Sequence, residues 1–480
     1  MNGCSCNGAR LFVLVVVASA AASAAQVLNP QASSADRIAR TMTLADARPV
    51  LAALGDRIPA GLGPDSDAEW FAWVKQRDAD IRARIATGDE DSLVNLMLYG
   101  TTFTRWPRAT PAAMAASAAN VRLDAVMDGR VADLVTAIES PGGDERLQFA
   151  RRVIERQGID VGPRSRAAAR RYMIALRSRV LSENERYMRR MAAAPMADES
   201  QRRMAYATLY RDRGLSSDTS LRVGFALEQA LAAVLDRGEL TRVPVERVAV
   251  VGPGLDFVDK AQGYDFYPVQ MIQPFALADS LQRLRIAERP AVTALDIGPR
   301  VLTHLRDARQ RAGRGQRYRL NVLLEHDLPH SKLDPALVEY WRRFGDRLGT
   351  GTAGDVPAAF ADQVRARAVD LRPEAVLDVT GAELNIVLER FSSAEAMSRF
   401  DLLVATNVLI YYDSVEQALA VSNMASMLRD GGLLLTNQPV PVPAACGLSA
   451  VLIMSVGLGR VESDTGSHER GDTIYVYRKA

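Results

Sequence analysis

The spacing of hydrophobic residues changes about half-way along this chain. From Ser33 to about Leu240, apolar residues recur every three to four positions, as in DAEWFAWVKQRDADIRARIA and RLQFARRVIERQG, and this period predicts amphipathic helices. No alternating strand pattern interrupts the stretch, and turn residues such as Pro141-Gly142-Gly143 separate the helices. We therefore expect an all-helical N-terminal domain over residues 26–205.

After Pro244 the pattern becomes one of short apolar runs that alternate with helical segments. VERVAVVGPGLDF contains the first predicted strand, and Ala291 to Ile297 (AVTALDI) forms the second, before an amphipathic helix from Arg300 to Arg311. This alternation predicts an α/β domain over residues 206–480, with a Rossmann-like, doubly wound sheet of about seven strands. Near the C-terminus, Ile474 to Tyr477 is expected to pair antiparallel with Val451 to Met454.

The clearest unit runs from Phe400 to Gln438. It predicts, in order, a buried strand, a polar tip, a helix and a second buried strand: Leu402 to Ala405, Thr406 with Asn407, Val415 to Leu428, and Leu433 to Thr436. Near-continuous apolar strands are typical of parallel sheets covered on both faces, and such sheets bind ligands at the carboxyl ends of their strands. We therefore expect the polar tip to lie at a ligand site.

Glycines and carboxylates follow other predicted strands. Gly252 and Gly254 end the first strand and Asp296 ends the second, which is the physical signature of a nucleoside site, because glycines allow close approach and a carboxylate accepts ribose hydroxyls. A third glycine is missing, and Asp296 lies further away than the roughly 20 residues expected for NAD, so hydride transfer is disfavoured. Asp370 and Leu371 end a further strand, where Asp370 suits either an adenine amine or a simple turn cap.

Composition excludes several other classes. The chain has 480 residues and a net charge of +2, which gives no reason to expect a general affinity for nucleic acid or anionic lipid. Its three cysteines cannot build a disulfide framework, and the C-x-C pair of Cys4 and Cys6 is too closely spaced for a usual zinc site. No G-x-S-x-G nucleophile motif is present. The sequence sets no oligomeric state.

The N-terminus indicates export. Arg10 precedes the apolar run LFVLVVVASAAASAAQ, and Ala22-Ser23-Ala24 offers a cleavage pattern, so residues 1–25 are expected to be a signal peptide of an exported or periplasmic protein. The longer segment from Leu11 to Leu28 just reaches the roughly 18 residues that span a bilayer. An uncleaved membrane anchor, or a misassigned start in a cytoplasmic protein, therefore stays open as an alternative.

About Tyr210 to Ala480 resembles the class I S-adenosylmethionine-dependent methyltransferases, and most nearly the CheR-type glutamate methyltransferases. The motifs that carry this resemblance are VVGPG (250–254), LDIGPRVL (295–302), AVDL (368–371), FDLLVATNVLIYYD (400–413) and LRDGGLLL (428–435). The resemblance implies the class I methyltransferase fold and S-adenosylmethionine as cofactor. It places Gly252 and Gly254 under the methionine portion, Asp296 with Ile297 at the ribose, Asp370 and Leu371 at the adenine, and Asn407 with Val408 at the sulfonium.

This resemblance implies a methyltransferase whose acceptor, a small molecule or a protein, is not identified by the sequence. The alternative is an exported, non-catalytic protein that keeps the fold for binding. The helical domain is expected to act as a lid or a substrate platform. Five residues are candidates to face the acceptor, none of them assigned as catalytic: Tyr411, Tyr412, Asp413, Tyr264 and Asp265. CheR-type proteins carry an arginine before the motif asparagine, where this chain has Thr406.

Overall fold

A computed structural model describes the chain over residues 39–55, 66–109, 121–193, 214–215, 221–240, 244–258, 263–327, 331–391, 399–463 and 466–480. The expected signal peptide or anchor, residues 1–25, lies outside these ranges. Within them, no helix is both long and apolar enough to cross a bilayer.

The largest sheet of the described residues has eight strands, in the order β5-β12-β13-β11-β10-β2-β3-β8. Five neighbouring strands run parallel: β11 (Leu428–Thr436), β10 (Phe400–Ala405), β2 (Arg247–Val251), β3 (Ala291–Asp296) and β8 (Val379–Glu383). β13 (Gly466–Lys479), β12 (Leu448–Ser463) and β5 (Ser331–Leu333) continue the sheet antiparallel. The mostly parallel α/β sheet is therefore as expected, whereas this sheet has eight described strands instead of about seven.

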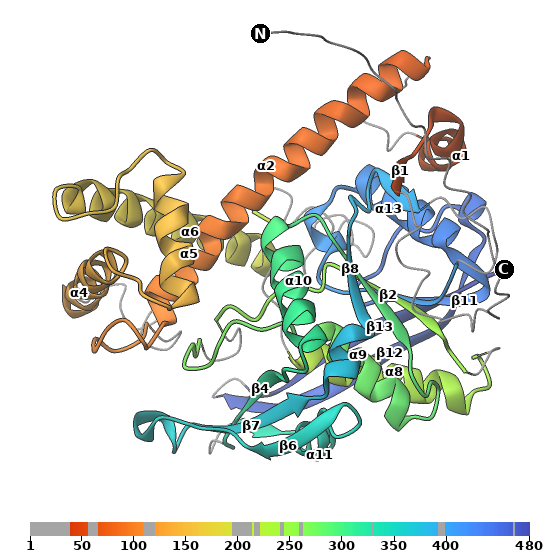
Figure 1. Ribbon diagram of the computed structural model, residues 1–480. Helices are drawn as coiled ribbons and strands as arrows, with labels where there is room; N and C mark the ends of the chain where they lie inside the picture. The colour runs from red at the N-terminus through yellow and green to blue at the C-terminus, as the bar shows by residue number, and fades with distance from the viewer. Residues whose placement is uncertain are drawn as a thin grey trace, which may run out of the picture.

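Alternate residues of the parallel strands face two different hydrophobic cores. Val248 and Val250 of β2 pack with α8 (Leu221–Asp236), α9 (Gln273–Arg283) and α10 (Pro299–Gly313) on one face. Ala249 and Val251 pack on the other face with α13 (Ser414–Met427) and α1 (Leu44–Leu54). Burial on both faces explains the continuous apolar runs of these strands, and Figure 1 shows helices on both sides of the sheet.

The predicted strand, helix and strand of residues 400–438 are confirmed. β10 is buried at every position and pairs in parallel with β11, with Leu403 opposite Leu434. α13 begins with a capping box between Asp413 and Glu416, and this cap fixes where the polar tip ends and the helix begins. The C-terminal hairpin is confirmed as well, because Met454 lies opposite Ile474.

A second, separate sheet corrects the prediction for residues 364–371. β7 (Val364–Leu371) lies between β4 (Tyr318–Glu325) and β6 (Gly349–Ala353), antiparallel to both. α11 (Pro335–Arg343) and α12 (Pro373–Leu377) belong to the same insertion between α10 and β8. The sequence of β7, VRARAVDL, mixes polar and apolar positions, which suits an antiparallel strand with one accessible face better than a strand of the parallel core.

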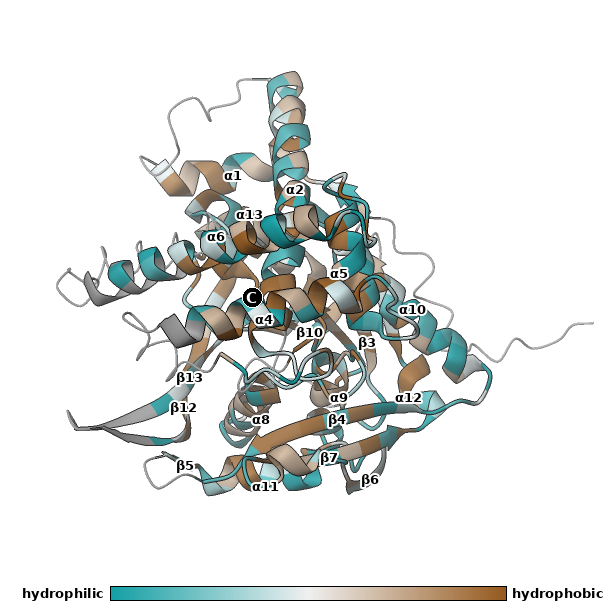
Figure 2. Cartoon of the chain, turned by 90° about the vertical axis from the view of Figure 1, so that its left-hand side faces the viewer, coloured by the Kyte–Doolittle hydropathy of each residue, from teal (hydrophilic) through white to brown (hydrophobic). Residues whose placement is uncertain are grey.

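The described part of the N-terminal half is helical apart from one short strand. Its helices are α1, α2 (Asp67–Tyr99), α4 (Val121–Ala137), α5 (Glu145–Glu155) and α6 (Arg166–Ala193), and Figure 2 shows hydrophilic and hydrophobic turns along α6. β1 (Ala39–Thr41), which the pattern did not predict, pairs with β9 (Glu389–Phe391). Buried residues of α4, α5 and α6 join the same cluster as β2 and α9, and α5 packs directly on the α/β body, because the Phe149 ring meets the Phe257 ring edge-on at 4.7 Å. The domain boundary at residues 205 and 206 stays a prediction.

Candidate functional site

A pocket lies at the carboxyl ends of β2, β3, β8 and β10. About 760 Å³ of space is unoccupied there, a figure that includes the open solvent at its mouth. From β2 the chain passes to β3 on one side, whereas β10 lies on the other, so the pocket is at the topological switch point of the sheet. Its lining residues are Ile85, Leu215, Val251, Gly252, Gly254, Gln273, Leu295, Asp296, Ile297, Gly298, Leu384, Ile386, Thr406, Asn407, Val408, Tyr411 and Tyr412.

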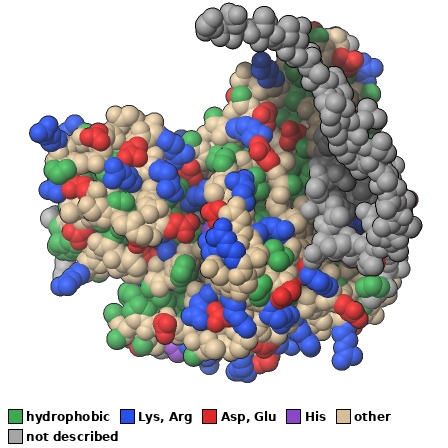
Figure 3. Space-filling model, viewed as in Figure 1, with side chains coloured by type: hydrophobic (Ala, Val, Ile, Leu, Met, Phe, Trp, Pro, Cys, Tyr) green, Lys and Arg blue, Asp and Glu red, His purple; other side chains and the backbone are tan. Residues whose placement is uncertain are grey.

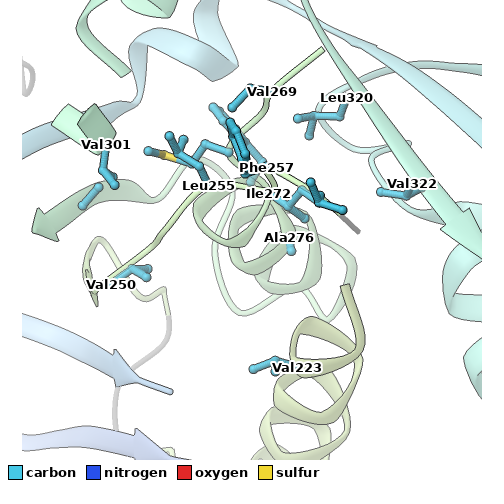
Figure 4. Packing of buried hydrophobic residues seen from close by; sticks show 14 of the residues in the cluster. Val223, Val250, Leu255, Phe257, Val269, Ile272, Ala276, Val301, Leu320 and Val322 are labelled. Atoms are coloured by element: carbon cyan, nitrogen blue, oxygen red, sulfur yellow. The ribbon is translucent and has the colours of Figure 1, made fainter. Parts of the chain in front are cut away.

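The turn after β2 depends on its glycines. Gly252 and Gly254 have φ values of 62° and 63°, a conformation that side chains other than glycine adopt at a cost. A Cβ atom on Gly252 would lie 2.4 Å from Cγ2 of Val408, so any larger residue would displace the opposite wall of the pocket. Leu255 and Phe257 anchor the end of the turn in the core beside α9 (Figure 4). The turn is thus a tightly packed, close-approach surface.

Asp296 is the only carboxylate among the pocket-lining residues described, and its side chain is half-buried. Burial raises its pKa to about 6, although backbone N–H groups of Gly298, Gly254 and Ile297 and the charge of Arg300 act in the opposite direction. The Gly298 N–H donates to Oδ1 at 2.6 Å. The surrounding backbone therefore holds a partly desolvated carboxylate in a fixed position, where it can accept hydrogen bonds from a ligand's hydroxyl groups.

Asn407 follows β10 in the left-handed region, with φ at 57°. Its backbone N–H donates to Oδ1 of Asn437, and Nδ2 of Asn437 donates to Oδ1 of Asn407, both at 2.8 Å. The two amides thus join the ends of β10 and β11 and hold a conformation that is uncommon for residues other than glycine. Val408 comes next and packs against Gly252.

Asp370 and Leu371 do not lie at the pocket, so the expectation that they share a sheet edge with Asp296 is wrong. Asp370 accepts two hydrogen bonds of 2.7 Å from Arg319 across the second sheet, and these hydrogen bonds lower the pKa of the Asp370 carboxyl. Leu371 is fully buried in the core. The strand beside β3 is β8, and the residues that follow it bring Leu384 and Ile386 to the pocket instead.

Of the five residues expected to face an acceptor, two line the pocket and three do not. Tyr411 and Tyr412 line the pocket, and burial raises the pKa of Tyr412. Asp413 accepts from the Val415 and Glu416 N–H groups as the cap of α13. Tyr264 packs in a small cluster with Val364 of the second sheet. Asp265 accepts from the N–H and hydroxyl of Thr101. These last three residues do not line the pocket, and their contacts stabilise the fold.

The helical part of the chain covers one side of the pocket. Ile85 of α2 and Leu215 both line it, and Figure 1 shows α2 crossing the molecule beside the sheet. A Cβ on Gly88 would lie 2.0 Å from the Leu215 carbonyl oxygen, so a glycine in the helix permits this close crossing. Arg84 Nη2 donates to the Tyr411 carbonyl oxygen at 2.8 Å and joins α2 to the pocket rim.

Sequence reasoning missed several pocket residues. Gln273 begins α9, and its Nε2 donates to Oγ1 of Thr406 at 2.6 Å. Ile85 lies in α2 and Leu215 in a non-helical segment, and in neither segment does the sequence distinguish the residue from a core residue. Leu384 and Ile386 had a signal, because they alternate with polar residues directly after the strand VTGAE.

No family model matches this sequence, and no curated protein matches it. Three solved structures that share some structural similarity are a magnesium protoporphyrin IX methyltransferase from Synechocystis PCC 6803, the glycopeptide N-methyltransferase MtfA, and a TehB-like methyltransferase from Corynebacterium glutamicum. Their identities are 12%, 10% and 12%, and the matches cover 54%, 55% and 54% of this chain and 82%, 88% and 98% of theirs. The TM-scores are 0.25, 0.26 and 0.22. Similarity at this level identifies no function for this chain.

Proposed function

We propose that this chain binds S-adenosylmethionine in the pocket and transfers its methyl group to an acceptor, either a small molecule or a protein. The observation that carries the proposal is the backbone-held carboxylate of Asp296 beside the turn formed by Gly252 and Gly254. Nucleoside ligands need both features. The ribose hydroxyls require a hydrogen-bond acceptor, and the glycines let the ligand approach the protein backbone closely.

The rest of the pocket fits the same ligand. Leu384, Ile386 and Ile297 supply apolar surface next to Asp296, which suits a purine ring. Three of the motifs that resemble methyltransferases, residues 250–254, 295–302 and 400–413, contribute lining residues. The other two motifs, residues 368–371 and 428–435, do not. We therefore assign the adenine contacts to Leu384 and Ile386 in place of Asp370 and Leu371.

The chain's own residues would act by binding and positioning. A bound S-adenosylmethionine supplies an electrophilic methyl group on a cationic sulfur. Asp296 would fix the ribose, while Gly252 and Val408 limit the space around the ligand's centre. Ile85 and Leu215 exclude water from the side that α2 covers. Positioning and exclusion of water supply much of the acceleration in such displacement reactions, so no residue here is assigned as a general base.

Calorimetric titration of the full chain with S-adenosylmethionine tests this proposal. We expect saturable binding to the wild-type chain, loss of binding in Asp296→Ala, and unchanged binding in Asp370→Asn. No heat and no thermal shift at millimolar ligand would overturn the proposal. Binding without methyl transfer to any acceptor in a broad panel would instead favour the non-catalytic alternative, which no contact among the described residues supports.

We also propose that the chain is exported through residues 1–25. N-terminal sequencing of the mature protein tests this, because a start near residue 26 supports a cleaved signal, whereas an intact Met1 points to an anchor or a cytoplasmic protein.

On the face shown in Figure 3, cationic and anionic side chains are intermixed, so this face presents no single-sign field for a nucleic acid or an anionic membrane.

A further inference from the structure

The pocket contains a buried polar pair that the ribose and adenine contacts do not use. Gln273 and Thr406 are 5% and 3% exposed, and both line the pocket. They come from different elements, because Gln273 is the first residue of α9 and Thr406 directly follows β10. Buried amides and hydroxyls are normally satisfied by hydrogen bonds, so the bonding of this pair shows what remains for a ligand.

The bond between them leaves one donor and one acceptor. Gln273 Nε2 donates to Thr406 Oγ1 at 2.6 Å, so the carbonyl oxygen of Gln273 is still an acceptor and the hydroxyl of Thr406 still has its proton to donate. Among the residues that the structure describes, neither group makes another hydrogen bond. The Thr406 hydroxyl and the Gln273 carbonyl oxygen therefore suit a ligand group that has both a hydrogen-bond acceptor and a hydrogen-bond donor.

Their position fixes which end of the ligand they would meet. Thr406 lies at the end of β10 and Asp296 at the end of β3, with β2 between them. Two strand spacings correspond to about 10 Å, a length that a nucleoside with an aminoacyl chain on its 5′ sulfur can span. α9 also begins at Gln273, and the positive end of its helix dipole favours a carboxylate nearby.

We propose that Gln273 and Thr406 recognise the amino-acid end of the ligand. The Thr406 hydroxyl donates to the α-carboxylate, and the Gln273 carbonyl oxygen accepts from the α-ammonium group. The inference rests on the proposed function and deepens it, because it assigns selectivity for the aminoacyl chain to two residues that contact neither ribose nor adenine. A neutral pair thus takes the place of a charged side chain, which is the more obvious choice for a charged ligand group.

Two ligands separate this role from general support of the pocket. S-adenosylhomocysteine carries the amino-acid chain, and 5′-methylthioadenosine has the same nucleoside and sulfur without it. Titrating the full chain with each, we expect Thr406→Val to weaken S-adenosylhomocysteine binding about tenfold, the effect of one lost hydrogen bond to a charged group. The affinity for 5′-methylthioadenosine should stay within about twofold. Thr406→Ser should restore most of the lost affinity.

Thr436→Val is the matched control. Thr436 ends the neighbouring strand β11, is fully buried, and donates its hydroxyl to the Gln438 carbonyl oxygen without lining the pocket. The Thr436→Val substitution should leave the affinity for both ligands unchanged. The inference is overturned if Thr406→Val weakens both ligands equally, or neither. If the wild-type chain binds neither ligand, the proposed function itself fails, and that result is distinct from a failure of this assignment.

Discussion

Replacing Asp296 by asparagine should strengthen the fold while it weakens the ligand site. The pKa of Asp296 is about 6 against an ordinary value of 3.8, chiefly because burial disfavours the charged carboxylate. A rise of about 2 in the pKa corresponds to roughly 3 kcal/mol of stability that the ionised group costs at pH 7. Asparagine removes that charge, but its NH₂ group cannot accept from the surrounding N–H donors, which offsets part of the gain.

The sign of the pH dependence follows from the same pKa. Because the folded-state pKa lies above the unfolded one, the folded chain holds the proton more tightly between about pH 4 and pH 6. Stability from this group is therefore fully present below about pH 4 and is lost as the pH rises through about 6. The asparagine side chain of the Asp296→Asn variant does not titrate, so the difference between the two proteins should shrink as the pH falls.

Denaturant unfolding at pH 7.5 and at pH 4.5 measures this difference. We expect Asp296→Asn to be more stable than the wild type by about 1–3 kcal/mol at pH 7.5, by a smaller margin at pH 4.5, and to bind S-adenosylmethionine at least tenfold more weakly. Asp401→Asn is the control, because hydrogen bonds to Glu246, Arg247 and Arg429 outweigh burial and lower the pKa of Asp401, so its loss should destabilise the fold at pH 7.5. A less stable Asp296→Asn, or an unchanged affinity, would refute the reasoning.

Three further substitutions test the placement of the site. Asp370→Asn should leave ligand affinity within about twofold in the same titration and change stability by less than about 1 kcal/mol, since it breaks only a partly exposed ion pair; a large loss of affinity would restore Asp370 to the site. Gly252→Ala should cost roughly 1–3 kcal/mol in denaturant unfolding, through positive φ and contact with Val408, and adding Val408→Ala should recover part of that loss; strictly additive costs would exclude the contact. Leu215→Ala should weaken ligand binding several-fold with little effect on unfolding, and an unchanged affinity would show that this residue does not cover the ligand.

Local pattern was enough to predict the central unit of the sheet. The strand of residues 400–405 is buried at every position, as its apolar run predicts. The next strand, β11, begins at Leu428 and not at Leu433, so Gly431 and Gly432 lie within it. In a buried strand such as β10 the sequence signal and the tertiary environment agree. The same holds for β2 and β3, whose carboxyl ends bring Gly252 and Asp296 together.

Strand partners could not be predicted in the same way. Residues 364–371 do form a strand, but its partners β4 and β6 lie in a separate antiparallel sheet. A strand's own residues do not state which strand it pairs with, and an insertion between α10 and β8 displaced the expected neighbour of β3. The polar positions Arg365 and Arg367 were the available sign that β7 is not part of a doubly buried parallel sheet.

Two pocket residues, Gln273 and Leu215, could not be predicted from local pattern for a related reason. Gln273 became part of the site because the first residue of α9 meets Thr406 across the pocket. Leu215 reaches the pocket because Gly88 lets its backbone approach α2 closely. Both contacts depend on how segments that are distant in the sequence approach one another, and no local sequence motif predicts either contact.

A crystal structure grown with saturating S-adenosylhomocysteine is the most direct test of the central claim. We expect both ribose hydroxyls within hydrogen-bond distance of the Asp296 carboxylate, and the adenine against Leu384 and Ile386. We also expect the amino-acid end of the ligand beside Gln273 and Thr406. A ligand bound at Asp370 or elsewhere, or a pocket without ligand at saturating concentration, would contradict it.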